Sequence, residues 1–226
     1  MKLLSFDTST PNFSLALSLN SSVKEESFNL GNELSDQIIP RIKSLLRGNN
    51  VALQDMDGIV IGIGPGSFTG LRIGLAAAKA FAFALNKPLV GVSSLDGLAV
   101  NALPYAKKIC CIADAKREKI YAAVYKNENG FLRRKTPYLL TDIKELLKRI
   151  SGEVWFIGDG LSLYQGQIKK RLGKRANFAS SDHWFPRAGN LAKLALPRFV
   201  SKKSDDLHKL LPIYLYPPEC QVRLKK

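Results

Sequence analysis

The sequence predicts an α/β protein made of two similar lobes, each with its elements in the order strand, strand, strand, helix, strand, helix. Three observations support this fold class. Short runs typical of strands, either apolar or alternating, separate longer segments whose apolar residues recur at helical spacing. The same order of elements occurs twice along the chain. In each copy the first predicted strand ends in an acid, Asp7 or Asp114.

The first copy begins with an apolar run that ends at Asp7 and continues with an alternating strand at 13–19. A third strand is predicted at 23–30, after a turn at 20–22. A helix follows from Glu33 to about Gly48, because its apolar residues recur at three- and four-residue intervals. The remaining elements are a buried strand at 58–63, an alanine-rich helix at 71–85, a strand at 87–92 and a helix at 96–103.

The second copy repeats this order. An apolar strand at 108–113 ends in Asp114, an alternating strand follows at 119–125, and a hairpin turn at 127–130 leads to a strand at 131–135. Asp142 and its neighbour Thr141 cap a short helix that ends near Ile150. A buried strand at 154–157, a helix reaching Leu172 and a final amphipathic helix at 188–200, interrupted at Pro197, complete the prediction.

This reading divides the chain into three parts. Residues 1–104 form the N-terminal lobe, residues 105–185 a smaller, shortened second lobe, and residues 186–226 a helix and tail that pack back on the first lobe. Ligands of open α/β sheets bind at the carboxyl ends of the strands. We therefore expect Asp7 and Asp114 to face a cleft between the lobes, unless they only cap turns.

Composition excludes several classes of protein. Apolar residues make up 46% of the 226 residues and charged residues 23%, which is typical of a globular domain and argues against disorder. No apolar run is long enough to span a membrane, and Asp7 interrupts the first one before a signal core forms, so we expect a cytoplasmic protein with no membrane partner.

The chain carries a large excess of positive charge. It has 34 Lys and Arg against 19 Asp and Glu, a formal net charge of +15. The cations cluster late in the sequence, at 133–135, 169–175 and 223–226. Each cluster is explained either by a solvated surface or by attraction to the phosphates of a nucleic acid, and no aromatic RNA-binding motif decides between the two.

Metal chemistry is not expected. The only histidines are His183 and His208, and the three cysteines, at 110, 111 and 220, lack the spacing of a zinc site or a disulfide framework. We therefore assign no metal ligands.

The densest motif is the glycine-rich run from Gly62 to Gly74, which follows a buried strand and opens a helix. This context suits anion binding at a helix N-terminus. The run is neither a P-loop nor a dinucleotide fingerprint, and Pro65 spoils a nucleophile elbow around Ser67. A serine hydrolase would also need a histidine base, which the spacing does not supply. Both close packing and ligand contact could account for the glycines.

Four segments together resemble the TsaB (YeaZ) family of bacteria. They are Asp7-Thr-Ser-Thr, the Gly-Pro-Gly-Ser-Phe-Thr-Gly-Leu-Arg-Ile-Gly run at 64–74, the block at 114–123 that begins Asp-Ala-Lys-Arg, and Pro-Ile-Tyr-Leu at 212–215. The resemblance covers almost the whole chain in order. It implies the actin-like ATPase fold and a role in making N6-threonylcarbamoyladenosine at position 37 of tRNAs that read codons beginning with adenine. It also implies partnership with the catalytic paralogue TsaD, with the ATPase TsaE, and with tRNA through the complex.

The resemblance implies an accessory subunit and no catalytic residues. In TsaD-like proteins the segment matching 91–98 carries two metal-binding histidines, at the positions that here are Ser94 and Leu98. Neither residue replaces a histidine ligand. The family often has His-Ser-Glu at the start of the first helix, where this chain has Leu34-Ser35-Asp36.

The candidate sites follow from both lines of reasoning. The family's dimer contact implies that the first two helices of the N-terminal lobe bind the partner, and the predicted interface residues are Ile38, Ile42, Leu71, Leu75, Ala78 and Phe81. These faces could equally cover the lobe's own sheet, but a second apolar face on 71–85 favours an interface. The candidate interlobe ligand contacts are Asp7, Thr8, Gly64, Gly66, Ser67 and Asp114. A bound nucleotide and a homodimer of the isolated chain stay open.

Two functions of other classes remain as alternatives. A free-standing nucleotide hydrolase or kinase of the same fold would use Asp7 and Asp114 to position Mg²⁺ and water. Against it, the second lobe is short and lacks a glycine-rich run for adenosine. An RNA-binding module acting alone would show salt-sensitive affinity for tRNA without any partner.

Overall fold

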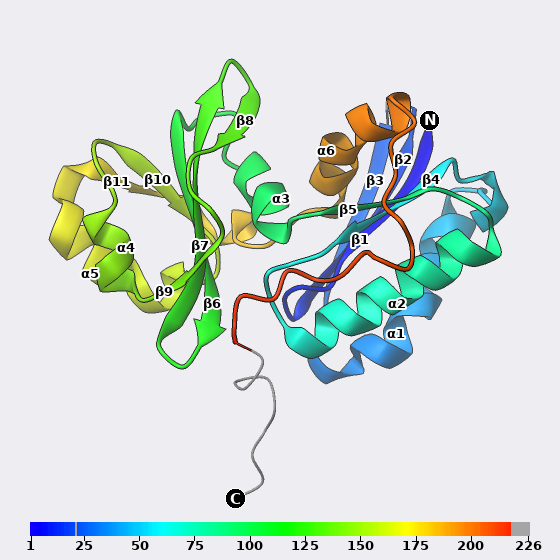
Figure 1. Cartoon of the computed structure of the whole chain (residues 1–226), viewed down its shortest axis with the longest axis horizontal. Coiled ribbons are helices and arrows are strands. Elements are labelled where there is room, and N and C mark those ends of the chain that lie inside the picture. The colour runs from blue at the N-terminus through cyan, green and yellow to red at the C-terminus, as the bar shows by residue number, and fades with distance from the viewer. Residues whose placement is uncertain (21, 218–226) are drawn as a thin grey trace, which may run out of the picture. The chain divides into compact units, whose positions relative to one another are not determined.

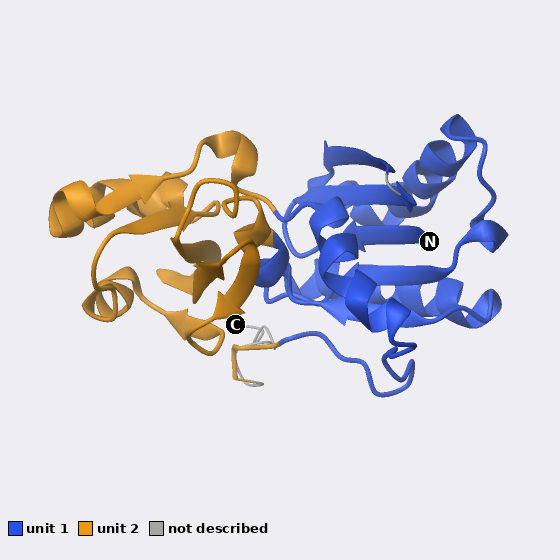
Figure 2. Cartoon of the chain, turned by 90° about the horizontal axis from the view of Figure 1, so that it is seen from above, with its two compact units in different colours: residues 1–97, 186–213 blue, residues 98–185, 214–226 orange. Residues whose placement is uncertain are grey.

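The computed structural model describes residues 1–20 and 22–217, which form two compact units (Figure 2). Unit 1 contains Met1–Gly97 and Pro186–Ile213, and unit 2 contains Leu98–Phe185 together with the chain from Tyr214 onward. The predicted basic residues at 223–226 and Cys220 lie outside the described residues. No helix among the described residues is both long and apolar enough to cross a membrane.

Unit 1 is built on a five-stranded sheet with the strand order β3-β2-β1-β4-β5 (Figure 1). The strands are β1 (Lys2–Asp7), β2 (Asn12–Leu19), β3 (Ser22–Asn29), β4 (Gly58–Gly62) and β5 (Leu89–Val92). The first three pair antiparallel, whereas β1, β4 and β5 run parallel. The carboxyl ends of β1 and β4 therefore lie at the same edge of the sheet.

Helices cover both faces of this sheet. They are α1 (Leu34–Gly48), α2 (Phe68–Ala84) and α6 (Ala188–Val200). Residues of α1 and α2 share one core cluster with Leu4 and Ile61, and residues of α6 share another with Leu3 and Val60. Successive strand residues point to opposite faces, so the neighbours Leu3 and Leu4 enter different clusters. This explains why β1 and β4 are apolar nearly throughout.

Unit 2 repeats the topology of unit 1. Its strands β6 (Lys108–Lys116), β7 (Lys119–Glu128), β8 (Phe131–Arg134), β10 (Val154–Ile157) and β11 (Ala176–Phe178) are ordered β11-β10-β6-β7-β8, and β9 (Leu139–Thr141) pairs with β7. In the same way as β1 and β4, β6 and β10 run parallel. The helices α4 (Ile143–Lys148) and α5 (Leu161–Leu172) pack in one core cluster with Cys110 and Phe156. The predicted duplication is confirmed.

Three details differ from the prediction. The short strands β9 and β11 were not expected. The strand β6 continues two residues past Asp114 to Lys116, with an irregular register between them. The last helix is not interrupted at Pro197 but runs through it to Val200. Pro197 lies in the final turn with its ring exposed, so the helix loses only one backbone hydrogen bond there.

One further helix matters for the site. The helix α3 (Ser94–Val100) follows β5 directly, and the boundary between the two units falls inside it, between Gly97 and Leu98. Four short 3₁₀ turns complete the description: η1 (Gly31–Glu33), η2 (Leu53–Asp55), η3 (Gly173–Arg175) and η4 (Ser181–His183).

Candidate functional site

The predicted acid of unit 1, Asp7, is fully buried and accepts three hydrogen bonds. It is 0% exposed, at the carboxyl end of β1. Its Oδ1 accepts hydrogen bonds from the backbone N–H of Ser9 at 2.8 Å and from the Ser9 hydroxyl at 2.5 Å. Its Oδ2 accepts a third from the Ser94 hydroxyl at 2.5 Å. Burial raises the pKa of Asp7 above its ordinary value, and the hydrogen bonds from Ser9 and Ser94 oppose that rise.

Ser94 joins Asp7 to the glycine-rich run. Its Oγ, while donating to Asp7, accepts a hydrogen bond from the backbone N–H of Gly64 at 3.1 Å. The carbonyl of Gly64 accepts in turn from the Ser93 hydroxyl at 3.1 Å and from the Ser94 N–H at 2.9 Å. The start of α3, the end of β1 and the glycine-rich run therefore form one buried hydrogen-bonded network, which we call the Asp7 network.

The glycines of the run allow close packing against the segment after β1. A Cβ on Gly62 would lie 1.8 Å from Asp7 Oδ2, and one on Gly66 would lie 2.2 Å from the carbonyl oxygen of Ser9. Gly70 and Gly74, on α2, approach Thr8 equally closely, with distances of 2.2 Å to its carbonyl oxygen and 2.1 Å to its Oγ1. No side chain fits at these four positions. Close packing is therefore sufficient to require glycine at these positions.

The two remaining candidates beside the run have different surroundings. Ser67 caps α2, because its Oγ accepts from the Gly70 N–H at 3.2 Å, and its own N–H donates to the carbonyl of Ser9 at 2.7 Å. Thr8 is 0% exposed, and its Oγ1 has no hydrogen-bond partner among the described residues.

The Asp7 network does not fit a metal-bound nucleotide. Both carboxylate oxygens of Asp7 already accept hydrogen bonds from protein donors, so a Mg²⁺ ligated by Asp7 would compete with Ser9 and Ser94 for them. The only polar atom of the predicted set that is buried and unbonded is Thr8 Oγ1, a neutral hydroxyl. The network is suited to holding three segments together, and not to chemistry on a phosphate.

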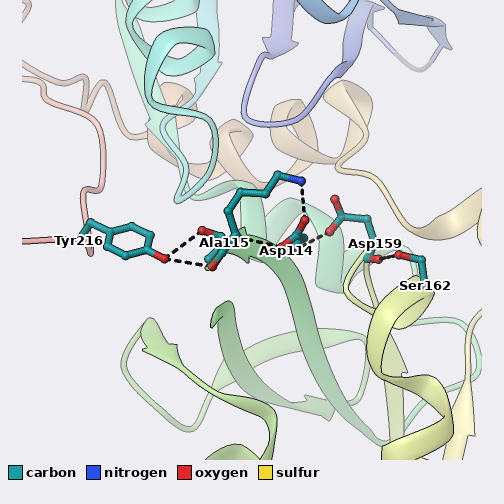
Figure 3. Close-up of polar contacts among 6 residues, drawn as sticks. Asp114, Ala115, Asp159, Ser162 and Tyr216 are labelled. Carbon is teal, nitrogen blue, oxygen red and sulfur yellow. Dashed lines mark hydrogen bonds and ion pairs between the residues drawn. The ribbon is translucent and has the colours of Figure 1, made fainter. Parts of the chain in front are cut away.

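The acid of unit 2, Asp114, has a different environment. Its Oδ1 accepts from the Lys116 N–H at 2.8 Å, and its Oδ2 forms an ion pair with Lys116 Nζ at 2.5 Å (Figure 3). Its backbone N–H donates to Oδ1 of Asp159 at 2.9 Å. Burial raises the pKa of Asp159, the hydrogen bond from the Asp114 N–H lowers it, and the negative charge of Asp114 raises it further. Asp159 is a site residue that the sequence analysis missed.

A signal for Asp159 was present in the sequence. It lies in the turn Gly158-Asp159-Gly160 directly after the buried strand β10, the same place that the glycine-rich run occupies after β4. A Cβ on Gly158 would lie 2.2 Å from the carbonyl oxygen of Ile112, so this turn also packs tightly on the first strand of its unit. The duplication therefore extends to the glycines that follow the fourth strand.

An open pocket of about 860 Å³ adjoins Asp114 within unit 2. Both acidic and basic side chains line the pocket. Lys116, Arg117 and Glu118, at the tip of the β6–β7 hairpin, all have backbone dihedral angles in the left-handed region. The pocket is lined by Asp114, Lys116, Arg117, Glu118, Lys119, Asp142, Ile143, Lys144, Glu145, Leu163, Tyr164 and Gln167. Tyr216 holds the hairpin next to its tip, because its hydroxyl donates to the carbonyls of Ala115 at 3.0 Å and Lys116 at 3.2 Å.

Most of the predicted interface residues are buried within unit 1. Ile38, Ile42, Leu71, Leu75 and Ala78 are each at most 6% exposed, and only Phe81 is half-buried. All except Leu71 belong to, or pack on, the cluster that fills the space between α1, α2 and the sheet. The four buried members of the cluster, Ile38, Ile42, Leu75 and Ala78, therefore cover their own sheet, so a partner on α2 would meet other residues of that helix.

The two positions that match the metal-binding histidines of TsaD-like proteins carry side chains with other roles. Ser94 belongs to the Asp7 network, and Leu98 is buried at 1% exposure. His183 Nδ1 lies 3.0 Å from the Ser180 hydroxyl. Within residues 1–20 and 22–217, no three His, Cys, Asp or Glu side chains gather closely enough to hold a metal ion.

Two units with the same strand order, each with its first strand hydrogen-bonded between an antiparallel and a parallel neighbour, define a duplicated α/β protein of the actin-like ATPase fold. The family model described as "TsaD: tRNA N6-adenosine threonylcarbamoyltransferase" matches residues 30–219. The tRNA threonylcarbamoyladenosine biosynthesis protein TsaB of Bacillus subtilis is 34% identical over 99% of this chain and 97% of its own length. The chain belongs to the TsaB (YeaZ) family.

Two other comparisons agree with this assignment. The protein of the same description from Escherichia coli is 29% identical over 95% of this chain and 94% of its own length. The solved structure of YeaZ from Pseudomonas aeruginosa superposes with a TM-score of 0.81 at 27% identity, and covers 95% of this chain and 99% of that one. The predicted family and fold are confirmed.

Proposed function

We propose that this protein acts in the biosynthesis of threonylcarbamoyladenosine in tRNA, as a non-catalytic subunit that binds and activates TsaD. The finer parts of this proposal are that TsaE and tRNA join the same complex, and that the complex works in the cytoplasm. Family membership supports the pathway, since the relatives from B. subtilis and E. coli carry this biosynthetic role in their names. The accessory role is supported by the chemistry of the Asp7 network.

The observation that carries the accessory role is the hydrogen bond between Ser94 and Asp7. The resemblance to TsaD places a metal-binding histidine at position 94, where this chain has a serine whose hydroxyl is consumed by Asp7 and Gly64. The second histidine position holds Leu98, a buried side chain without a ligand atom. A site that lacks both imidazoles and has no free carboxylate oxygen favours a structural contribution over catalysis.

The outward face of α2 is the surface that best fits a protein partner. Its exposed positions are polar in the first turns, at Thr69 and Arg72. Further along the helix they carry small or aromatic apolar side chains, at Ala76, Ala80, Phe83 and Ala84, and Phe83 is 75% exposed. Alanines at four-residue intervals allow a second helix to approach closely. A groove of about 280 Å³ between α1 and α2, lined in part by Ile39, Leu46 and Phe81, continues this apolar surface.

Charge reversal on this face tests the partnership. The double variant Ala80→Glu with Phe83→Glu places two carboxylates where an apolar helix must dock, so we expect co-purification with TsaD to be lost. Both positions are exposed, so unit 1 should melt at an unchanged temperature. Val200→Glu, which changes a side chain that is 70% exposed at the end of α6, is the matched control and should retain TsaD. Leu75→Glu would be uninformative, because Leu75 is buried and its replacement would unfold unit 1.

Reconstitution tests the function itself. Purified protein, TsaD, TsaE, threonylcarbamoyl-adenylate and tRNA are combined, and each is omitted in turn while the modified adenosine is measured. We expect modification to depend on this chain and to be retained by Asp7→Asn in a folded complex. Full modification without this chain would contradict the proposal. ATP turnover by the isolated chain that is lost in Asp7→Asn would instead favour the free-standing nucleotide enzyme.

A further inference from the structure

Five cations gather where α5 ends in unit 2. They are three consecutive residues of its last turn and the two residues that close η3, and all five are exposed. We call this set the α5 basic cluster: Lys169, Lys170, Arg171, Lys174 and Arg175. Neither α5 nor η3 contains an acid, so the cluster has no compensating charge on its own elements.

The α5 basic cluster differs from several other cations of unit 2, which have acidic partners. Lys119 pairs with Asp142, Lys148 pairs with Glu145, and the cations of the β7–β8 hairpin share one acid. Within the part of the chain that the structure describes, no side chain of the α5 basic cluster forms an ion pair or a hydrogen bond. Five like charges in adjacent turns repel each other, and no acid on α5 or η3 offsets this repulsion.

Helix stability does not account for the cluster. Cations in a last helical turn interact favourably with the helix dipole, which explains Lys169–Arg171 but not the two cations in η3. The helix α2 occupies the equivalent place in unit 1, after the fourth strand, and has no cation in its last turn. The fold therefore forms this element without such charges, and their presence on α5 points to something outside the chain.

We propose that the α5 basic cluster binds the phosphate backbone of RNA. At a rise of about 1.5 Å per residue in the helix and about 2.0 Å in the 3₁₀ turn, the cluster is roughly 10 Å long, a span over which a nucleic-acid duplex presents several phosphates. Exposed and unpaired Lys and Arg side chains are the groups that neutralise phosphates. The identification of the RNA as tRNA rests on the proposed function.

Salt dependence of tRNA binding by the full-length chain tests this proposal. The variant Lys170→Gln, Lys174→Gln, Arg175→Gln removes three cations from solvated positions. Each phosphate contact contributes about 0.7–0.9 to the slope of log affinity against log salt, so three contacts make affinity fall by about 20- to 40-fold between 50 and 200 mM salt. We expect the wild-type chain to show this additional loss and the variant to lack it, as measured by fluorescence anisotropy with labelled tRNA.

The matched control removes the same net charge elsewhere in unit 2. Arg133→Gln, Arg134→Gln, Lys135→Gln changes cations that already have partners, since Arg133 and Lys135 pair with Glu128 and Arg134 lies 3.9 Å from the ring centroid of Tyr138. This variant should keep most of the wild-type slope. Equal slopes in the wild type and the α5 variant, or an equal loss in the control, would overturn the proposal.

Two parallel measurements distinguish RNA from a membrane surface and from the protein partner. Vesicles of phosphatidylserine and phosphatidylcholine should bind the wild-type chain no better than the α5 variant. If the vesicles bind through the cluster and tRNA does not, the cluster recognises a membrane and the proposal is wrong. Co-purification with TsaD is expected to be unchanged in the α5 variant, so failure of the TsaD partnership is detected independently of RNA binding.

Discussion

Replacing Ser94 with alanine tests whether the start of α3 holds the Asp7 carboxylate and the glycine-rich run together. The substitution removes one hydroxyl that makes two buried hydrogen bonds, a donation to Asp7 Oδ2 at 2.5 Å and an acceptance from the Gly64 N–H at 3.1 Å. Both atoms that lose a partner are in a region closed to water. The charged bond contributes about 1.5–3 kcal/mol, and leaving a buried N–H unpaired costs about 1–3 kcal/mol.

Together these effects predict that Ser94→Ala destabilises unit 1 by about 3–4 kcal/mol. For a unit of this size the melting temperature should fall by about 10 °C. Ser93→Ala is the matched control, because the Gly64 carbonyl that loses the Ser93 hydroxyl still accepts from the Ser94 N–H at 2.9 Å. The control should therefore lose about 1 kcal/mol or less.

Thermal unfolding followed by two signals measures this effect. Both tryptophans, Trp155 and Trp184, belong to unit 2, so their fluorescence reports on that unit, whereas far-ultraviolet circular dichroism reports on both. We expect the circular-dichroism transition to shift more in Ser94→Ala than in Ser93→Ala. Equal shifts in the two variants, or a shift of less than about 3 °C in Ser94→Ala, would refute the hydrogen-bond reasoning.

Three further predictions concern unit 1. Burial raises the pKa of Asp7, so the folded unit binds a proton more tightly than the unfolded chain, and this contribution is present at low pH and lost as the pH rises through the folded pKa. Lowering the pH from about 7 towards 4 should therefore stabilise the wild type relative to Asp7→Asn, and parallel urea-midpoint curves for the two would contradict this. Gly62→Ala places a Cβ 1.8 Å from Asp7 Oδ2 and should lower the free energy of unfolding, measured with urea, by about 2 kcal/mol or more. Gly48→Ala is the control, because nothing lies within 4 Å of the added Cβ, and it should be neutral or slightly stabilising. Asp205→Asn weakens the two contacts from Arg198, at 2.7 and 3.1 Å, and should cost about 1 kcal/mol at low salt and less at high salt, as judged by urea unfolding.

The sequence was sufficient to predict the duplicated order of elements because hydrophobic periodicity is a local property. The alternation at 13–19 and the helical spacing of Ile38 and Ile42 each identify their element without knowledge of the rest. The strands β9 and β11 were not predicted, because three residues are too few to show the alternation of a strand. The continuation of α6 through Pro197 was not predicted, because the free-energy cost of a proline depends on its position in the helix and not only on its presence.

The candidate site was harder to predict because its determining contacts are between distant residues. The acid at position 7 was identified, but the hydroxyl that binds it is 87 residues further along. The sequence could therefore not indicate that both carboxylate oxygens are occupied. The predicted interface residues show the same limit, since an apolar helix face looks the same whether a sheet or a partner covers it. The structure buries Leu75 and three of its companions against their own sheet.

The assembly of unit 1 from two separated stretches of sequence has a consequence for synthesis on the ribosome. The sheet face that carries Leu3 and Val60 is covered by α6, which is translated only after the whole of Leu98–Phe185. At about 5–20 residues per second, the ribosome needs roughly 5–20 s to make that intervening segment, and during this time α6 does not yet cover the apolar face of the sheet. A chain released before Ala188 would therefore expose an uncovered sheet to chaperones and proteases.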